Sequence, residues 1–435
     1  MLMGGSSCLI NFTPKFKGEA NTKLFSYALL TILRNSLFIF VILFLGMEFF
    51  GSYVKLEFIY YSVILALFLA GLDLLKKQLT IHKKIAFPTV LDNLIPKLVL
   101  PLIFILYYYN FIEGDIIGLS LYICAYFIII LALFLYGSKL KIFLFTLQIK
   151  ALFTIISKKE YYNYSFFALA GSLGYLFVFK LDALMIPNLI SYKANGVYSI
   201  ATVAASVIFI PARGMFSLYA PQVSSMVKAE RFQELNTLYK NVARSLLFLG
   251  LLIYSAIFLG VENLFQIMPS KEVLLQTVLV IYIIGATSVF NMATGFNSEI
   301  INYSKYYKFN IIALGILTLL NLVCNYVFIV TYNWGIEGAA LASFLSIVIY
   351  NLLKVGFIYK RMNLLPFDSV FFKLLFVQFA LILVFYLLPN FSNPFFNIVF
   401  KVGGVLFSQL FLIYKFNWVQ AYTSFLDKYI FRTTI

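Results

Sequence analysis

Charged side chains interrupt long apolar runs of this sequence, and charge inside such runs is costly enough to suggest a function. Arg34 is about ten residues into one run, roughly mid-bilayer if that run is a membrane helix. A guanidinium there either lines a wet cavity, where it can bind a diphosphate or acidic sugar bidentately, or forms a structural ion pair. Arg213 follows Pro211 near the end of another run, where it lines the same path or reaches lipid headgroups. Lys97 and Lys401 lie near run ends and are expected to reach the headgroups.

Asp182 is the single acidic residue in the apolar run that ends at Pro187. Lys180 lies two positions before it, and residues two apart on a helix point to different faces. The two are therefore not simply a mutual ion pair. Asp182 is a candidate for coupling to a proton or sodium ion, or for structural pairing, and Lys180 either lines the solute path or extends outward.

Asparagines form a second set of polar candidates within the runs. Asn291 and Asn297 lie toward the end of one run, and Asn321 and Asn325, spaced i,i+4, share a face of the next. Hydrogen bonding between helices and a polar path for a solute both explain such residues. No glycine-rich nucleotide motif or D-x-D pair occurs, so we expect no nucleotide-driven pump and no cofactor.

The sequence contains few residues that could bind a metal ion or act through histidine. Cys8, Cys124 and Cys324 are scattered without a C-x-x-C pair, and His82 is the only histidine. A zinc site needs several such ligands, so we expect no metal centre. An enzyme that used histidine as acid or base would depend on His82 alone, so we expect a protein that is not an enzyme.

The composition then identifies the elements that must position these side chains. Of 435 residues, 62% are hydrophobic and only 11% are charged, whereas a soluble domain is roughly 25% charged. A soluble enzyme and a disordered chain are both excluded, which leaves a polytopic membrane protein with about a dozen spans. The apolar runs of spanning length are residues 24–47, 57–75, 91–112, 117–136, 165–187, 197–219, 243–264, 274–297, 309–331, 336–358, 369–388 and 395–416.

The net charge of +16 is a topology signal. Of the 33 Lys and Arg residues, 26 fall at alternate connections and chain ends, and Arg244 and Lys354 are counted among them. Lys and Arg accumulate on the cytoplasmic side of membrane proteins, so we expect both termini to be cytoplasmic. This pattern accounts for the charge and removes nucleic acid as a partner.

Two segments resemble each other, residues 5–40 and 214–249. Each contains a proline, a short basic loop and an arginine early in the next run, Arg34 and Arg244. We interpret them as parallel repeats of two bundles, with chance likeness of two basic loops as the alternative. The stretch from Met1 to Pro14 is too short to span and is expected to be the end of a helix whose beginning is missing.

The motifs of residues 179–226 and 333–354 resemble those of bacterial polysaccharide flippases, of the O-antigen type, in the multidrug/oligosaccharidyl-lipid/polysaccharide exporter superfamily. They include FKLD, GVYS and a final P-x-V-S, and later GIEGAALAS followed by N-x-x-K. The start, MGGSSCLINFTPKFK, is similar to the end of that family's second helix.

The resemblance implies an all-α polytopic membrane protein with two pseudo-repeated bundles around a central cavity. The expected parts are an incomplete N-terminal bundle of a stub and four spans (1–143), a six-span bundle (144–361) and two additional helices (362–435). It further implies alternating-access flipping of an undecaprenyl-diphosphate-linked oligosaccharide to the outer leaflet of the bacterial inner membrane, for lipopolysaccharide or other polysaccharide export. The implied partners are that lipid-linked substrate, membrane lipids and a coupling proton or sodium ion. A multidrug or cation antiporter of the same superfamily is the first alternative, and a membrane enzyme of polysaccharide assembly is another.

Overall fold

Helices make up all the regular structure that the computed structural model describes. The described residues are 4–15, 20–45, 56–143, 145–146, 149–154, 156–178, 180–419 and 422–423. No strand occurs among them. The chain forms two compact units: unit 1 is Met1–Ala170 with Ala220–Lys228, and unit 2 is Gly171–Tyr219 with Ala229–Ile435.

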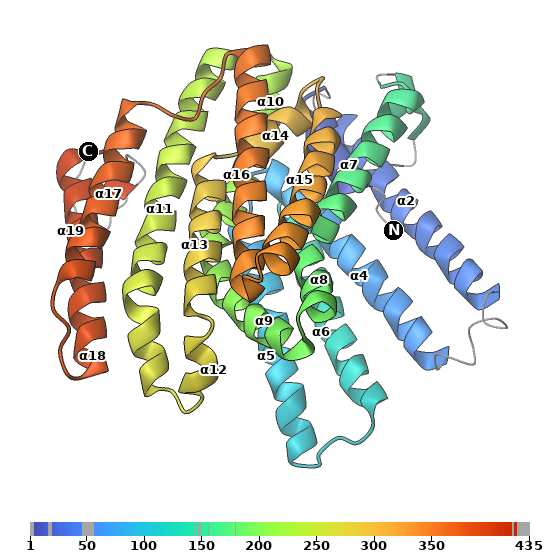
Figure 1. Cartoon of the computed structure of the whole chain (residues 1–435). Coiled ribbons are helices and arrows are strands. Elements are labelled where there is room, and N and C mark those ends of the chain that lie inside the picture. Colours follow the sequence, from blue (N-terminus) through green and yellow to red (C-terminus); the bar gives the residue numbers. More distant parts are fainter. Residues whose placement is uncertain are drawn as a thin grey trace. The chain divides into compact units, whose positions relative to one another are not determined.

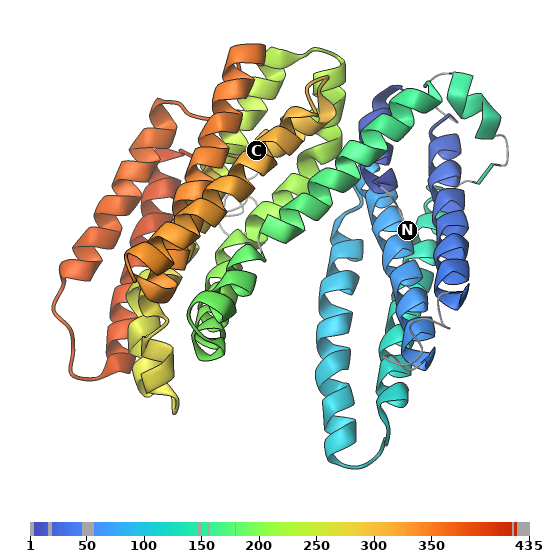
Figure 2. The same cartoon turned by 45° about the vertical axis from the view of Figure 1, so that its right-hand side comes forward.

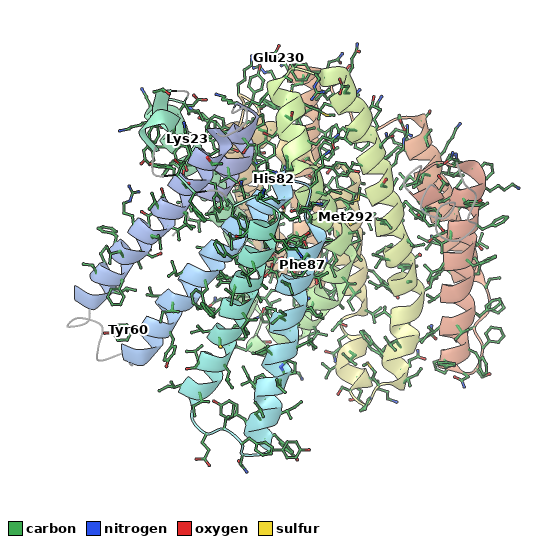
Figure 3. All side chains as sticks on the ribbon, turned by 180° about the vertical axis from the view of Figure 1, so that it is seen from behind. Lys23, Tyr60, His82, Phe87, Glu230 and Met292 are labelled. Carbon is green, nitrogen blue, oxygen red and sulfur yellow. The ribbon has the colours of Figure 1, made fainter. Side chains whose placement is uncertain are left out.

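Unit 1 contains four long helices and shorter segments beside them (Figure 1). Its elements are α1 (Gly5–Phe12), η1 (Thr13–Lys15), α2 (Ala20–Leu45), α4 (Leu56–Ile81), α5 (Ala86–Tyr108), α6 (Asp115–Lys139), η2 (Ile149–Thr154) and the first part of α7 (Lys158–Val178). Helices α5 and α6 form an antiparallel hairpin (Figure 2). Lys23 and His82 lie at one end of this unit, and Tyr60 lies at the opposite end (Figure 3).

Unit 2 contains the remaining helices, and the unit boundaries fall within α7 and α10. Its elements are α8 (Leu181–Leu189), α9 (Tyr192–Ser206), η3 (Val207–Phe209), α10 (Ile210–Lys228), α11 (Phe232–Ile267), α12 (Lys271–Leu275), α13 (Val278–Ala293), α14 (Asn297–Tyr303), α15 (Phe309–Tyr326), η4 (Val327–Thr331), α16 (Gly335–Met362), α17 (Ser369–Leu387), α18 (Pro394–Asn397), η5 (Ile398–Val402) and α19 (Gly403–Phe416). Helix α16 packs on α13 and α15, and α11 packs on α13 and α17.

The exposed surfaces of these helices are strongly apolar. Phe104 on α5, Phe376 on α17 and Phe407 on α19 are 65%, 74% and 72% exposed. Exposed aromatic rings in such number suit hydrocarbon rather than water as the surrounding medium. By length and composition, nine helical stretches of the described residues can cross a membrane, and the bent pair α13 and α14 makes a tenth.

The described residues of each of the twelve predicted runs lie mostly on a helix or on consecutive helices. The two runs outside that count of nine or ten, 57–75 and 165–187, lie on α4 and on α7 with α8. The predicted all-α, polytopic fold class is therefore confirmed, and the protein is a multi-pass membrane protein. The predicted domain boundaries at residues 143 and 361 stay predictions.

A glycine permits the sharp bend of 46° between α13 and α14. Gly295 has φ +64°, a left-handed conformation that side-chain-bearing residues rarely adopt. A Cβ atom there would also come within 2.9 Å of the Tyr239 ring on α11. The bend therefore depends on the absence of a side chain at this position.

Three cations differ from their sequence-based placement. Lys354, counted among the loop cations, lies inside α16 and is 1% exposed. Lys401, expected to reach the headgroups, is buried, and its ammonium donates to the carbonyl of Leu388 at the end of α17. Arg244, also counted with the loops, lies within α11 and pairs with Asp368. The partners of these cations lie on or beside other helices, which loop counting does not detect.

The Arg244–Asp368 pair ties α11 to the start of α17. The guanidinium contacts both carboxylate oxygens, and Asp368 also accepts the N–H of Phe371 at 2.9 Å as the N-cap of α17. Burial alone would raise the pKa of the Asp368 carboxyl. The bonds from Arg244 and Phe371 and the charge of Arg244 outweigh burial and lower that pKa below its usual 3.8.

We predict that Asp368→Asn destabilises the protein by about 2 kcal/mol at neutral pH, because Asn keeps the N-cap and loses the ion pair. A carboxyl whose pKa is lowered by folding stabilises above its unfolded pKa, and that stability is lost as pH falls through the folded value. Thermal unfolding in detergent should therefore show the wild type losing more stability than Asp368→Asn on acidification below about pH 4. Asp368→Ala, which loses the cap as well, should be the least stable. Equal acid sensitivity of the wild type and Asp368→Asn would contradict the assignment.

Candidate functional site

A partly buried carboxylate in unit 2 is surrounded by four neutral hydrogen-bond donors, and we call these five residues the Asp182 centre. The Tyr198 hydroxyl and the Ser343 hydroxyl each donate to Oδ2 of Asp182 at 2.6 Å. Nδ2 of Asn325 donates to Oδ1 at 2.9 Å, and Nδ2 of Asn321 lies 3.5 Å from the same oxygen. Both carboxylate oxygens are thus held from more than one side.

The four donors come from three helices that pack against α8. Asn321 and Asn325 are one turn apart on α15, and Nδ2 of Asn325 also donates to Oδ1 of Asn321 at 3.1 Å. Tyr198 on α9 belongs to the same buried core as Ile186 of α8. Ser343 on α16 completes the group. Since α8 contacts α9, α15 and α16, the carboxylate links all four helices.

No cation neutralises Asp182 among the described residues. None of the ion pairs there involves this carboxylate, so hydroxyl and amide dipoles alone stabilise its charge. Asn325 is fully buried, and its Oδ1 has no hydrogen-bond partner in the described part of the chain. One carboxylate with several neutral oxygens suits a proton or a hard monovalent cation. The described residues contain no group of three or more His, Cys, Asp or Glu side chains that suits a metal ion.

Protonation of Asp182 would disturb this arrangement. A carboxylic acid carries a donor on one oxygen, whereas here both oxygens accept hydrogen bonds. Tyr198 or Ser343 would have to turn its hydroxyl toward another acceptor. The charge state of Asp182 is therefore linked to the contacts of α8 with α9 and α16.

Sequence reasoning selected three members of the centre and missed two. Asp182, Asn321 and Asn325 were candidates on charge and spacing, and the structure brings them together. Tyr198 and Ser343 were not selected, although they lie in the GVYS and GAALAS motifs. Lys180 precedes α8, is exposed, and is not a member of the centre.

The two other predicted asparagines join a second network at the bend between α13 and α14. Nδ2 of Asn351 on α16 donates to Oδ1 of Asn291 at 3.0 Å. Oδ1 of Asn351 accepts from Asn297 at 2.9 Å and from Thr294 at 3.1 Å. One side chain of α16 therefore holds residues on both sides of the bend, and Asn291 and Asn297 have helix-joining roles here.

The two predicted arginines are exposed and lack carboxylate partners among the described residues. Arg34 lies near the middle of α2 in unit 1, and its guanidinium contacts only Oδ1 of the neighbouring Asn35, at 3.3 and 3.4 Å. Arg213, in the first turn of α10 in unit 2, lies over the ring of Phe209 at 6.0 Å. Within the described residues, neither arginine therefore has an opposite charge beside it.

His82 does not form a catalytic group in the described structure. It lies exposed in the turn after α4, and no carboxylate pairs with its ring among the described residues. A general base needs an orienting partner and a reacting group within hydrogen-bond reach. The geometry around His82 therefore offers no support for histidine-based catalysis.

Comparisons with known proteins place this fold among transporters and flippases. No family model and no curated protein matches the sequence. A mutant of the Vibrio cholerae MATE transporter VcmN is similar over 85% of each chain, with 14% identity and a TM-score of 0.68. The MATE transporter ClbM in complex with Rb+ matches 87% of this chain and 84% of its own, with 15% identity and a TM-score of 0.61. The lipid II flippase MurJ matches 95% and 89%, with 15% identity and a TM-score of 0.59. The chain has the fold shared by MATE transporters and MurJ.

Proposed function

We propose that this protein flips a lipid-linked diphosphate glycan across the membrane by alternating access. The observation that carries the proposal is the exposed guanidinium of Arg34 near the middle of a 26-residue spanning helix. An arginine in hydrocarbon is strongly disfavoured, so Arg34 must face water or an anion. A diphosphate accepts the planar guanidinium bidentately, and it is the charged group that prevents such a lipid from crossing unaided.

The comparison with Arg244 strengthens this assignment. Arg244 is the counterpart of Arg34 in the predicted repeat, and Asp368 neutralises it within unit 2. Arg34 has no such partner among the described residues of unit 1. One copy of the repeat therefore uses its arginine to join helices, while the other leaves the charge available for an anionic substrate. Arg213 and Lys180, exposed in unit 2, are further candidates for contact with an anionic substrate.

We assign the Asp182 centre to ion coupling, with a proton or sodium as the ion. Its neutral donors, its link to four helices and the unpartnered Oδ1 of Asn325 suit a site whose occupancy changes helix contacts. The substrate would be an undecaprenyl-diphosphate-linked oligosaccharide of polysaccharide or O-antigen export. The corresponding location is the bacterial inner membrane with both termini in the cytoplasm, as the distribution of Lys and Arg favours.

Organic-cation antiport is the second candidate function. A partly buried carboxylate suits the binding of a cation, and the MATE transporters VcmN and ClbM share this fold. The exposed cations Arg34, Arg213 and Lys180 favour an anionic substrate instead. Transport of ethidium by the purified protein, without flipping of a diphosphate lipid, would replace the first proposal with this one.

We predict that Arg34→Gln lowers the flipping rate of a fluorescent undecaprenyl-diphosphate glycan in proteoliposomes by about tenfold or more, because one bidentate contact to the diphosphate is lost. Arg34→Lys should retain part of the rate, since the charge remains without the planar fork. Lys97→Gln, which removes an exposed cation from another helix of unit 1, is the matched control and should leave the rate unchanged. Wild-type flipping by Arg34→Gln would overturn the proposed role.

We predict that Asp182→Asn abolishes the response of flipping to imposed proton or sodium gradients, because the side chain can no longer change its charge. The assay compares initial rates with and without each gradient in the same proteoliposomes. Ser343→Ala is the matched control, since it removes one donor and keeps the carboxylate, so its rate should still respond. A gradient response in Asp182→Asn equal to that of the wild type would exclude the coupling role.

A further inference from the structure

Two lysines of unit 2 are buried within membrane helices, and their ammonium groups are satisfied very differently. Lys401 is 5% exposed, and Lys354 is 1% exposed. Nζ of Lys401 lies 2.7 Å from the Leu388 carbonyl, 2.7 Å from Oδ1 of Asn390 and 3.4 Å from the Tyr386 carbonyl. An ammonium has three N–H donors, so each donor of Lys401 has an oxygen acceptor.

The ammonium of Lys354 has one oxygen partner among the described residues. Nζ donates to the hydroxyl of Ser298 on α14, and it lies 4.2 Å from the ring centroid of Tyr350 on its own helix. No carboxylate pairs with it among the described residues. A buried charge with so few partners carries a large desolvation penalty.

Two neighbouring polar side chains of the described residues are already engaged with other partners. The Oδ1 of Asn351, one turn before Lys354, is taken by Thr294 and Asn297. The Ser298 hydroxyl that receives Lys354 itself donates to Oδ1 of Asn297 at 3.4 Å. Ser298 is only partly buried, so its side chain lies between the Lys354 ammonium and an accessible surface of α14.

We propose that Lys354 binds an oxyanion of the phosphate class at the junction of α14 and α16. A phosphate oxygen that displaces the Ser298 hydroxyl would give the ammonium a charge-assisted bond in place of a neutral one. Arg34, Lys180 and Arg213 are exposed, so this is a separate site that becomes accessible when Ser298 gives way. The oxyanion is either free phosphate or diphosphate, or the headgroup of a lipid, and the proposal does not require that the protein flips lipids.

The first experiment measures oxyanion binding by thermal unfolding of the purified full-length chain in neutral detergent. Inorganic pyrophosphate should raise the midpoint of the wild type by about 3 °C or more over chloride at matched ionic strength. Lys354→Met should lose this shift, and Lys354→Arg should recover it. Lys401→Met, the matched control, removes a buried lysine of the same unit and should keep the shift. A shift in Lys354→Met equal to that of the wild type would overturn the site.

Lipid-borne phosphate is tested in neutral-lipid nanodiscs that contain undecaprenyl diphosphate, undecaprenol or phosphatidylglycerol. A shift that depends on Lys354 and occurs with a phosphate-bearing lipid but not with free pyrophosphate identifies a headgroup site. A shift with pyrophosphate identifies a site for the free ion. If no phosphate-bearing probe shifts the wild type, the proposal is wrong, and this outcome is independent of any flipping assay.

Stability without any oxyanion provides a second, independent measurement. Lys354→Met removes an unsatisfied buried charge and leaves no partner without a bond, since Ser298 still donates to Asn297. Its unfolding midpoint should equal or exceed that of the wild type. Lys401→Met leaves three oxygen acceptors at the end of α17 without a donor and should lower the midpoint. A fall in midpoint for Lys354→Met as large as that for Lys401→Met would show that Lys354 is a structural residue, contrary to the proposal.

Discussion

The scarcity of water around buried charge is the constraint on which the rest of this structure depends. Hydrocarbon offers no hydrogen bonds, so an ionised side chain inside a span needs partners from the protein, from water or from a bound anion. Asp368 provides an opposite charge for Arg244, carbonyls surround the ammonium of Lys401, and hydroxyl and amide donors surround Asp182. These three charges are stabilised by an opposite charge, by carbonyl oxygens and by neutral donors. The kind of partner separates residues that join helices from residues whose charge or occupancy can change.

The neutral donors around Asp182 connect several helices through one carboxylate, which an ion pair between two residues does not do. Four donors from three helices converge on one carboxylate, so any change in its charge or occupancy alters several helix contacts together. In the Arg244–Asp368 pair each charge is neutralised by the other, so neither side chain needs a ligand. Unit 2 therefore combines a fixed connection between α11 and α17 with an adjustable one among α8, α9, α15 and α16.

The sequence predicted the helical fold well because the hydrophobic signal is local and strong. In every predicted run most of the described residues lie on a helix or on consecutive helices, and the i,i+4 spacing of Asn321 and Asn325 placed both on one face. Partners across helices were harder to predict. Asp368 is 124 positions from Arg244, and Ser343 is 161 positions from Asp182. A basic residue near a run end looks like a loop residue until its buried partner is known, which is why Lys354 and Lys401 were misplaced.

The bend between α13 and α14 has a further consequence. Gly295 gives the backbone freedom to fold at this point, but Asn351 of α16 binds residues on both sides of it. The side chain of Asn351 therefore connects the two sides of the bend and fixes its geometry. Further bending at Gly295 would have to break these hydrogen bonds of Asn351. The geometry of the bend is therefore tied to α16, the helix that also carries Ser343.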